Sequence, residues 1–475
     1  MQAPLINQVI DKSIHDIRSC SWVKDEFREA DFGDRRLFLR FLVVAEHLTQ
    51  LPEALIPQAS QGWSKTKAAY RFFDNKSITP EKILDPHISK TVTRAAYQNE
   101  PVLVIQDTTF LNYSHMVTSE DLGPIGSAES FCMGLVMHTS LAVSSRGLPL
   151  GIVDQVIWAR SKEEHGKAKL RKSRRFEDKE SFRWIEAQRR YNARMHRLPM
   201  VVTICDREAD IYDLFYDSTQ IDGKFLIRAK HNRSLGNDKL WHFMQQQDVA
   251  DSYTIEVPEH ENSPRRQARV EIRFAPIPLR YPLDRPRARK IPDIQAWAVY
   301  VREIDPPPTS KPVEWMLLTN VPVLSTADAL EKVSWYKIRW IIEIFHRILK
   351  SGCRVEYARL EKNHRRTSYL TIKSIIAWKL LLLTYFHRIS PDQPAQALMS
   401  KIECSALYVA INNRLPHNIA FNARQAIRWL GELGGFLSRK SDKEPGPTHV
   451  WRGWQRLQDF TKMMYVLSPT QHNSF

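Results

Sequence analysis

Three acidic residues of this chain have the types and positions needed for chemistry on phosphodiesters. Asp107 follows the apolar run 102–105 and Asp206 follows the apolar run 200–205, so each is predicted to close a buried strand. Side chains at the ends of neighbouring strands can converge on one point, and a third carboxylate, Glu343, can join them from a helix. Carboxylates are hard oxygen ligands that suit Mg²⁺, and a pair of such ions promotes in-line displacement at a phosphodiester.

The third carboxylate lies on a long helix that the sequence predicts from Thr326 to at least Lys350. Apolar residues recur along it every three or four positions and form a core-facing stripe, which consists of Ile338, Ile341, Ile342, Phe345 and Leu349. The offset face is polar and consists of Tyr336, Arg339, Glu343, His346, Arg347 and Lys350. Cations therefore lie one turn away from the carboxylate on either side.

Each of these groups also has an ordinary structural explanation. A single aspartate at the end of a strand is commonly a helix N-cap or a turn residue. A helix face with alternating charges is commonly solvated and laced with salt bridges. The acids Glu208 and Asp210, close to Asp206, could orient the site or cap the helix that follows. The occurrence of all three carboxylates in a strongly basic chain favours a catalytic site.

Length and charge limit the classes of protein to consider. The chain has 475 residues, with 69 Lys and Arg against 53 Asp and Glu, and a formal net charge of +16. At about 100–200 residues per domain this length allows two to four domains. The 43% hydrophobic and 26% charged residues exclude overall disorder. Such a positive surplus predicts a polyanionic partner, which could be nucleic acid, an anionic membrane surface or an acidic polymer.

A membrane location is not expected. The most apolar stretch, 375–386, contains Lys379 and is shorter than the roughly 20 residues of a spanning helix, so it is predicted to be a buried helix. Residues 1–18 do not have the pattern of a secretory signal. The five cysteines are scattered and never form a C-x-x-C pair, which argues against a disulfide framework or a zinc knuckle and favours a reducing cytoplasm.

Three regions follow from the change of pattern along the chain. Residues 1–100 are predicted to be helical, and residues 101–370 to form a mixed α/β unit with an all-β insertion at about 250–322. Residues 371–475 are again predicted to be helical. The N-terminal region mixes cations with aromatic residues, which suits DNA binding, although a plain solvated face is an alternative.

Positive charge is concentrated in two further segments. Between Arg160 and Arg175 there are eight Lys and Arg residues. Between Arg265 and Lys290 there are nine, against two acids, on what is predicted to be a β-ribbon. Such a ribbon is a candidate phosphate-contacting arm.

The polar helix face carries the string Tyr336-x-x-Arg339-x-x-x-Glu343, followed by Lys350, and this string resembles the Y-R-E-K signature of DDE transposases of the insertion-sequence-four group. The resemblance extends in the same order along nearly the whole chain. The segments that carry it are Trp22–Phe27, Gly33–Arg36, Ala69–Phe73, Asp107–Thr109, Cys205–Ile211, Trp315–Thr319, Arg339–His346, Lys350–Cys353, Leu433–Phe436 and Trp451–Trp454.

The resemblance implies an RNase H-like catalytic core, interrupted by the all-β insertion and flanked by a helical N-terminal DNA-binding domain and a helical C-terminal dimerisation domain. Asp107, Asp206 and Glu343 would be both catalytic residues and metal ligands, with two Mg²⁺ ions per site and Mn²⁺ able to substitute. The residues expected to contact DNA are Tyr336, Arg339, Lys350, Arg347, His346, Trp315, Arg207, Arg71 and Tyr70.

Trp315 and Arg347 are the two positions at which the resemblance implies something more specific. Trp315 would help to accommodate a base flipped out during hairpin formation, and the alternative is a core tryptophan that alternates with Met316. Arg347 stands where lysine is expected from the family, which keeps the charge but changes the geometry of phosphate binding.

The implied activity is cut-and-paste DNA transposition. The protein would bind inverted-repeat ends, cleave the DNA through hairpin intermediates and join the 3′-hydroxyl ends to target DNA, as a homodimer in a synaptic complex and without a membrane partner. The segment 451–465 is the candidate dimer contact, and the expected location is the bacterial cytoplasm, on the nucleoid when DNA is bound. The alternatives are an RNase H-like nuclease without strand transfer and a DNA-binding inhibitor of transposition.

Overall fold

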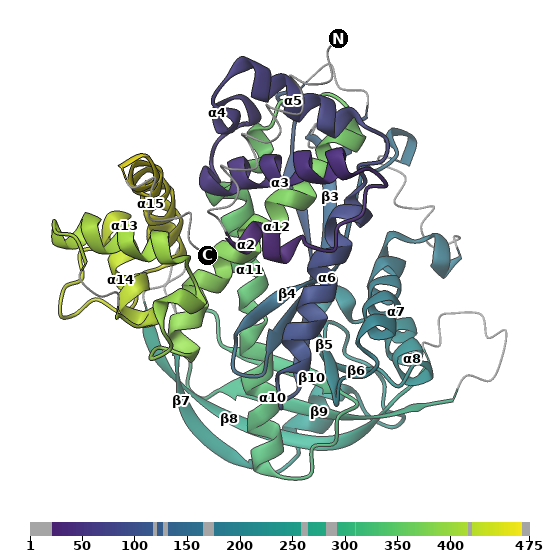
Figure 1. Ribbon diagram of the computed structural model, residues 1–475. Helices are drawn as coiled ribbons and strands as arrows, with labels where there is room; N and C mark the ends of the chain where they lie inside the picture. The colour runs from purple at the N-terminus through teal and green to yellow at the C-terminus, as the bar shows by residue number, and fades with distance from the viewer. Residues whose placement is uncertain are drawn as a thin grey trace.

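The computed structural model describes residues 21–116, 121–126, 132–164, 175–257, 265–281, 292–308, 310–416 and 420–467. The N-terminal part is helical, as predicted. Its elements are α2 (Ser21–Glu26), α3 (Arg35–Gln50), α4 (Ile56–Ser60), α5 (Trp63–Asp74) and α6 (Pro80–Ala96). The Asp34 side chain accepts a hydrogen bond of 2.7 Å from the Arg36 amide and so caps α3, while Pro80 begins α6. Helices α3, α4 and α5 lie at the top of Figure 1.

One ten-stranded sheet organises the rest of the described chain. Its strand order is β2-β3-β1-β5-β6-β10-β9-β8-β7, and β4 pairs with β3 beside this path. The strands are β1 (Val102–Asn112), β2 (Gly123–Pro124), β3 (Met133–Ser144), β4 (Pro149–Trp158), β5 (Val201–Cys205), β6 (Lys224–Arg228), β7 (Asp251–Val257), β8 (Arg266–Leu279), β9 (Ile294–Glu303) and β10 (Glu314–Thr319).

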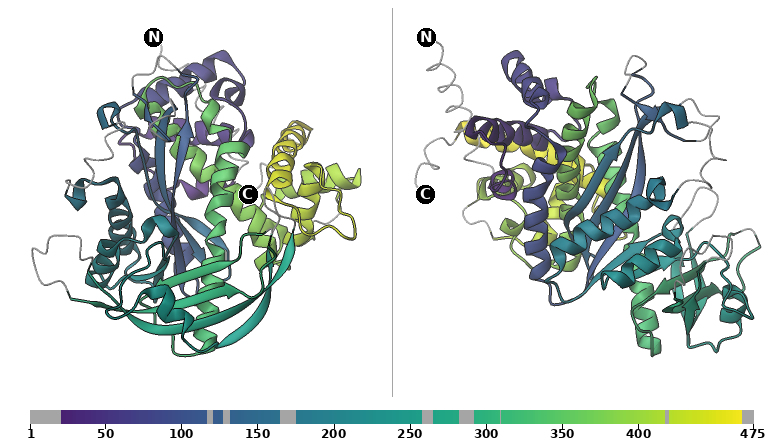
Figure 2. Two further views of the ribbon diagram at one scale, coloured as in Figure 1. Left: turned by 180° about the vertical axis from the view of Figure 1, so that it is seen from behind. Right: turned by 90° about the vertical axis from the view of Figure 1, so that its right-hand side faces the viewer.

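The strands β4, β3, β1, β5 and β6 form an RNase H-like core. The first three are antiparallel, with β3 and β4 joined as the predicted hairpin, and β5 and β6 then add in parallel to β1. Helices α7 (Arg183–Met195) and α8 (Tyr212–Gln220) connect the later strands and pack on one face. Helices that follow β10 pack on the other face, as Figure 2 shows from the side. The expected fold class is confirmed.

The strands of the β-rich insertion continue the catalytic sheet. The short helix α9 (Leu240–Gln245) precedes them, and β10 pairs antiparallel with β6 before β9, β8 and β7 extend the edge. The sequence predicted the strands but not this continuity, because period-2 patterns identify strands without identifying their partners. In Figure 1 the long β7, β8 and β9 curve along the bottom of the molecule.

Several cations of the basic ribbon are paired with acids inside it. Arg265 pairs with Glu256, and Arg273 lies 2.9 Å from Glu271. A similar pair joins Arg266 to the buried Glu303. The segments 282–291 and 165–174, which hold many of the cations counted in the sequence, lie outside the described residues. Phosphate contacts by this ribbon stay a prediction.

Asp107 does not close its strand, contrary to the sequence analysis. Strand β1 continues to Asn112, because β3 pairs with it over its whole length from Val102 to Asn112. The parallel partner β5, in contrast, ends at Cys205, so Asp206 follows its strand as predicted. Asp107 therefore lies in mid-strand, at the level where the parallel neighbour has stopped.

The long helix predicted from Thr326 is divided into three parts. It consists of α10 (Thr326–Ile338), α11 (Trp340–Arg347) and a π-helical turn from Ile348 to Gly352. The break at Arg339 and the wider π turn were not predicted, because a hydrophobic stripe fixes which side is buried and not the local hydrogen-bond pattern. The predicted stripe is correct, with its members buried except for the half-buried Ile338.

Helix α12 (Asn363–Ile389) is the central helix of the protein. It contains the apolar stretch of the sequence analysis but is longer, and among the described residues it is the helix whose length and composition would allow it to cross a membrane. Of its most apolar window, 83% is buried inside the protein, so it is a core helix, as predicted. The helix also runs without interruption across residue 370 and joins the sheet to the C-terminal helices.

The C-terminal helices are α13 (Lys401–Asn412), α14 (Ala423–Leu433) and α15 (Pro447–Leu467), shown in yellow-green and yellow in Figure 1. The glycines of the two C-terminal motifs explain how α14 and α15 meet. A Cβ atom at Gly453 would overlap the carbonyl oxygen of Leu430, and one at Gly434 would overlap that of His449. Backbone therefore packs directly on backbone at this crossing.

Replacing Gly453 by alanine is expected to push α14 and α15 apart and to destabilise the C-terminal helices by about 1–3 kcal/mol, as overpacking does in other cores. Faster proteolysis of this region and a lower thermal midpoint would show it. Gly446 is the matched control, because nothing lies within 4 Å of a Cβ added there. Equal stability of the two variants would contradict the close packing.

The described cysteines are free, with Cys205, Cys353 and Cys404 buried.

Candidate active site

The sheet places Asp107 and Asp206 side by side. Strands β1 and β5 pair in parallel with Ile105 opposite Ile204, and the same offset brings Asp107 opposite Asp206. Parallel neighbours are roughly 4.8 Å apart. Ile105 and Ile204 belong to the core that α11 and α12 complete, and Asp107 follows Ile105 by two residues, so its side chain points to the same face. The predicted convergence of the two aspartates agrees with this register.

Negative charge is crowded around Asp107. Burial raises the pKa of its carboxyl group, and the charges of Asp206 and Glu343 raise it further, against the influence of Arg339, so that it reaches about 7. The effect of Glu343 shows that α11 brings the third carboxylate within electrostatic reach of β1. A carboxyl group whose pKa is raised by burial together with like charges is typical of a functional site.

His346 contacts this group from the helix. Its Nδ1 lies 3.6 Å from Oδ2 of Asp107, and its side chain is buried. Burial and the charges of Lys350 and Arg339 lower its pKa to about 3, so the imidazole is neutral at physiological pH. Its Nε2 has no hydrogen-bond partner within the described residues. The sequence placed His346 on a DNA-facing surface, whereas the structure places it against Asp107.

Glu343 is held by the predicted cation one turn earlier. Arg339 donates a hydrogen bond of 3.0 Å to Oε1 of Glu343, and its guanidinium lies 6.0 Å from the ring of Tyr336. Tyr336 is mostly buried and meets Trp315 edge to face, with ring centroids 5.7 Å apart. A row of contacts therefore leads from Trp315 on β10 to the carboxylate on α11.

The position of Trp315 bears on the two hypotheses made for it. Its neighbour Met316 is buried in the core on the opposite face, under α8, as the alternation of a strand requires. Trp315 itself is half-buried and packs beside Tyr336. It is therefore not a fully buried core residue, and it lies on the side of the sheet that carries the carboxylates.

The remaining cations predicted for the site differ in exposure. Lys350 is half-buried in the π turn, where burial lowers its pKa and the charges of Glu356 and Asp107 oppose that effect. Arg347 on α11 and Arg207, directly after Asp206, are exposed to solvent. Lys350 thus belongs to the electrostatic surroundings of Asp107, whereas Arg347 and Arg207 are free to meet a partner at the rim.

The three carboxylates are not preassembled into a chelate. The described residues contain no group of three His, Cys, Asp or Glu side chains placed to hold one ion together. The ion pair of Glu343 with Arg339 accounts for this, because it turns one donor toward a cation of the protein. The donors nevertheless fit divalent ions, since they are hard oxygens and the buried Asp107 carboxyl also lies near the negative charges of Asp206 and Glu343.

Asp210 and Glu208 are the two acids whose roles the sequence did not decide, and their surroundings differ. Asp210 is buried and accepts hydrogen bonds of 2.7 and 2.8 Å from the amides of Lys230 and His231, while Arg233 pairs with it. It therefore fixes the loop after β6. Glu208 is exposed and lies 3.3 Å from Arg183 of α7.

Sequence reasoning missed Arg183, His138 and Arg228, which surround the site. His138 lies opposite Thr108 in the β1–β3 register, and Arg228 of β6 donates to the carbonyl of Glu314 and lies next to Tyr336. Their sequence neighbourhoods are ordinary strand and helix patterns. Only the pairing register of the strands and the packing of α7 against them could have identified these residues.

The N-terminal residues predicted to contact DNA belong to a separate part of the molecule. On α5, Arg71 is exposed and Tyr70 is half-buried. The exposed Trp63 begins the same helix, with the Lys67 ammonium 4.9 Å from its ring centroid. Exposed cations beside aromatic rings suit contact with nucleic acid.

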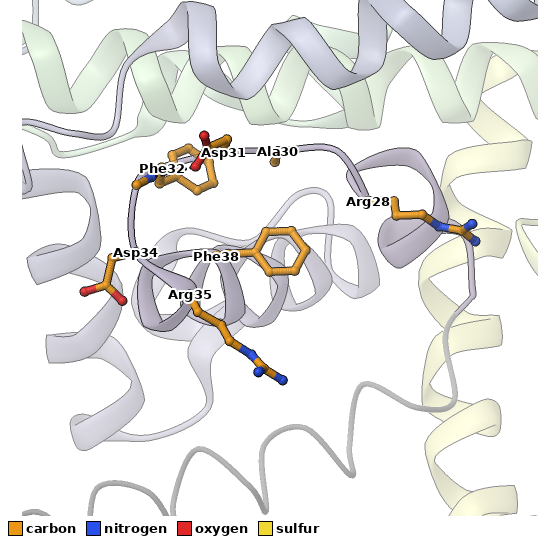
Figure 3. A pocket seen from close by; sticks show the side chains of 8 residues that line it. Arg28, Ala30, Asp31, Phe32, Asp34, Arg35 and Phe38 are labelled. Atoms are coloured by element: carbon orange, nitrogen blue, oxygen red, sulfur yellow. Dashed lines mark hydrogen bonds between the residues drawn. The ribbon is translucent and has the colours of Figure 1, made fainter.

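A pocket of about 350 Å³ opens at the turn between α2 and α3, next to these helices (Figure 3). It includes the segment Gly33–Arg35 that the sequence analysis singled out, and Figure 3 shows Asp34 and Arg35 on the loop and helix that border it. The residues that line it are Arg28, Ala30, Asp31, Phe32, Gly33, Asp34, Arg35 and Phe38. None of the three carboxylates takes part in it.

An RNase H-like sheet that sets two aspartates beside each other, with a helix glutamate within electrostatic reach, is typical of enzymes acting on phosphodiesters. Comparison with protein families agrees. Residues 154–379 match the model described as Transposase DDE domain, and residues 19–78 match the one described as Transposase DNA-binding. Residues 375–468 match the Transposase Tn5 dimerisation domain. The protein is thus a DDE transposase, a metal-dependent enzyme that binds DNA, dimerises, and cleaves and joins DNA strands.

Within that class the chain belongs to the Tn5-like transposases of the insertion-sequence-four group, since all three models match in the expected order. Among solved structures, the chain is similar to a piggyBac transposase synaptic complex with hairpin DNA determined by cryo-electron microscopy, at 10% identity and a TM-score of 0.39. That similarity covers 95% of this chain and 79% of the other.

Proposed function

We propose that Asp107, Asp206 and Glu343 hold two Mg²⁺ ions, with Mn²⁺ able to substitute, and form the catalytic centre of this transposase. The observation that carries the proposal is the β1–β5 register, which sets Asp107 beside Asp206 within reach of Glu343. When bound, such ions lower the pKa of an attacking hydroxyl and balance the charge that develops on the phosphodiester.

The surrounding side chains would bind and orient the DNA. Arg339 would exchange its contact with Glu343 for a phosphate, and Tyr336 and Lys350 would hold neighbouring phosphates so that the scissile bond stays in register. Arg347 and Arg207 would extend this contact at the exposed rim. Neutral His346 would keep the Asp107 carboxylate oriented without adding a positive charge that competes with a metal.

The finer steps follow the family pattern. The substrate would be the inverted-repeat ends of a transposon, cleaved through hairpin ends and joined by their 3′-hydroxyls to target DNA. Trp315 would stack on the base displaced in the hairpin, because its ring lies half-exposed on the carboxylate side of the sheet. Tyr70 and Arg71 would contact the end sequence from α5.

The same proposal assigns three domains: 1–100 for DNA binding, 101–370 for catalysis and 371–475 for dimerisation in the synaptic complex. On α15, Trp454 is buried within the chain, whereas Phe460, Met463 and Val466 are exposed at a spacing of three residues. This exposed apolar row is the proposed dimer contact. The enzyme would act in the bacterial cytoplasm, on the nucleoid.

The decisive experiment uses the full-length protein, Mg²⁺ or Mn²⁺, and a duplex that carries the inverted repeat flanking the gene. Double-strand breaks with hairpin ends and joined products are expected. Nicks without joining would instead identify an RNase H-like nuclease, and binding without cleavage would identify an inhibitor of transposition. Either of these two results would overturn the proposal.

A further inference from the structure

The side chain of Arg183 spans the two strands that carry the aspartates. Its Nε donates a hydrogen bond of 3.0 Å to Oγ1 of Thr108, the residue after Asp107. One terminal nitrogen of the same guanidinium lies 3.3 Å from Oε2 of Glu208, two residues after Asp206. The other terminal nitrogen donates a bond of 2.9 Å to the carbonyl oxygen of Glu180. All three nitrogens of the planar group are therefore committed to the protein.

On the β1 side the contact continues into a buried chain of hydrogen bonds. Thr108 Oγ1 lies 2.8 Å from Nδ1 of His138, and Nε2 of His138 lies 2.9 Å from Oε1 of Gln106. His138 is buried and meets Trp184 edge to face at 4.7 Å. The residues on both sides of Asp107 are thus fixed from the face of the sheet opposite the carboxylate.

On the β5 side the contact reaches the turn that Asp206 itself forms. Oδ1 of Asp206 accepts a hydrogen bond of 2.8 Å from the amide of Glu208, so the orientation of this carboxylate depends on the position of residue 208. Arg183 holds Glu208 from the neighbouring helix. One side chain is therefore linked to the surroundings of both aspartates.

We propose that Arg183 is a positioning residue that sets the spacing of the Asp107 and Asp206 carboxylates for metal binding. The inference rests on the proposed catalytic centre. A planar guanidinium with donors at fixed angles can join two acceptors at a defined separation, which a lysine ammonium does less well. Outer residues that orient metal ligands commonly change metal affinity or activity 10–100-fold.

A direct contact of Arg183 with DNA phosphate is the competing role. The geometry favours positioning, because each of the three guanidinium nitrogens already donates a hydrogen bond within the protein and only 16% of the side chain is exposed. A phosphate-binding arginine would instead lose end binding when replaced, and its loss would flatten the salt dependence of that binding.

The test measures the binding of Mn²⁺ to the full-length protein by electron paramagnetic resonance, together with DNA binding in the presence of EDTA. Arg183→Gln is expected to raise the Mn²⁺ dissociation constant about tenfold or more, and to leave DNA binding and its salt dependence unchanged. Arg183→Lys is expected to recover part of the affinity. Thr108→Val removes one arm of the bridge with little change of volume.

If the bridge acts as one unit, Arg183→Gln with Thr108→Val should bind Mn²⁺ no more weakly than Arg183→Gln alone. Arg189→Gln is the matched control, because Arg189 lies on the same helix and pairs with Asp217 of α8, outside the site. Unchanged Mn²⁺ binding by the Arg183 variants would overturn the inference, and so would weaker DNA binding with a flatter salt dependence.

Failure of this inference can be separated from failure of the proposed centre by including Asp107→Ala. If Asp107→Ala loses Mn²⁺ binding and the Arg183 variants do not, the positioning role of Arg183 is refuted and the metal-ligand assignment stands. If Asp107→Ala binds Mn²⁺ as well as the unaltered protein does, the assignment of Asp107 as a metal ligand is refuted.

Discussion

Asp107→Ala is expected to bind transposon-end DNA and to cleave none of it. The residue lies on strand β1 beside Asp206 and within electrostatic reach of Glu343, so its removal takes a ligand from the proposed metal centre. Metal ions contribute several kcal/mol to such a reaction, which corresponds to a loss of roughly 10³-fold or more in rate. End binding should be kept, because the variant removes a negative charge and no phosphate contact. Gel assays of cleavage and of mobility shift on the same duplex measure both.

Asp85→Asn is a suitable control, because Asp85 lies on α6, exposed and 2.8 Å from Arg194. This surface pair should contribute little, and cleavage should be unchanged. Residual cleavage by Asp107→Ala would refute its assignment as a ligand. Loss of DNA binding along with cleavage would point to a folding defect and would call for the isosteric Asp107→Asn.

The sequence identified the parts of the site that depend on local patterns. Asp206 directly follows its strand as predicted, and Ile342 and Phe345 of the predicted stripe are buried, which leaves Glu343 half-buried on the polar side of the helix. Both inferences use periodicity within a single element, which the chain encodes locally. The family signature then linked the elements, and the matched family models confirm the family.

The parts that were missed depend on contacts between elements. Asp107 is in mid-strand because β3 pairs with β1 far beyond the end of β5. The sequence of residues 102–112 does not indicate how long the neighbouring strands are. His346 is buried because α11 packs against the strand that carries Asp107, whereas a helical wheel shows one apolar face and leaves the rest open. Arg183 donates its hydrogen bond to Thr108 across 75 residues of sequence, so no local pattern relates the two.

The net charge of +16 also has a more specific meaning in the structure. Part of it is neutralised within the fold, as in the pairs of Arg265 with Glu256 and of Arg266 with Glu303. The exposed cations near the carboxylates, Arg347 and Arg207, and those on α5 remain available. The charge that matters for DNA is therefore the unpaired part, and its position beside the site is what steers a polyanion to the acids.

A buried acid connects the N-terminal helices to the catalytic sheet. Glu26 of α2 accepts hydrogen bonds of 2.8 and 2.9 Å from both terminal nitrogens of Arg94 on α6, and lies 2.5 Å from Nδ1 of His87. His87 Nε2 accepts from the amide of Ile152 on β4, so this histidine is neutral and carries its proton on Nδ1. Trp378 of α12 covers the cluster, with the Arg94 guanidinium 4.4 Å from its ring. The helices α2, α6 and α12 and the strand β4 are therefore connected through the cluster around the Glu26 carboxylate.

Glu26→Gln is expected to destabilise the protein by about 3 kcal/mol at pH 7. Burial raises the pKa of Glu26, but the hydrogen bonds from His87 and Arg94 and the charge of Arg94 outweigh it. The pKa falls from 4.5 to about 2, and each unit corresponds to about 1.4 kcal/mol. Because the folded pKa is depressed, this stability is present above pH 4.5 and is lost as the pH falls toward 2. The difference in thermal midpoint between the variant and the unaltered protein should therefore be largest near neutrality and should shrink between pH 5 and about pH 2.

Asp25→Asn is the matched control. The exposed carboxylate of Asp25 pairs with Arg28 and Lys90 on the surface, so its loss should change the midpoint little. A gap that stays constant with pH would show that Glu26 stabilises the protein by its shape and hydrogen bonds and not by its charge.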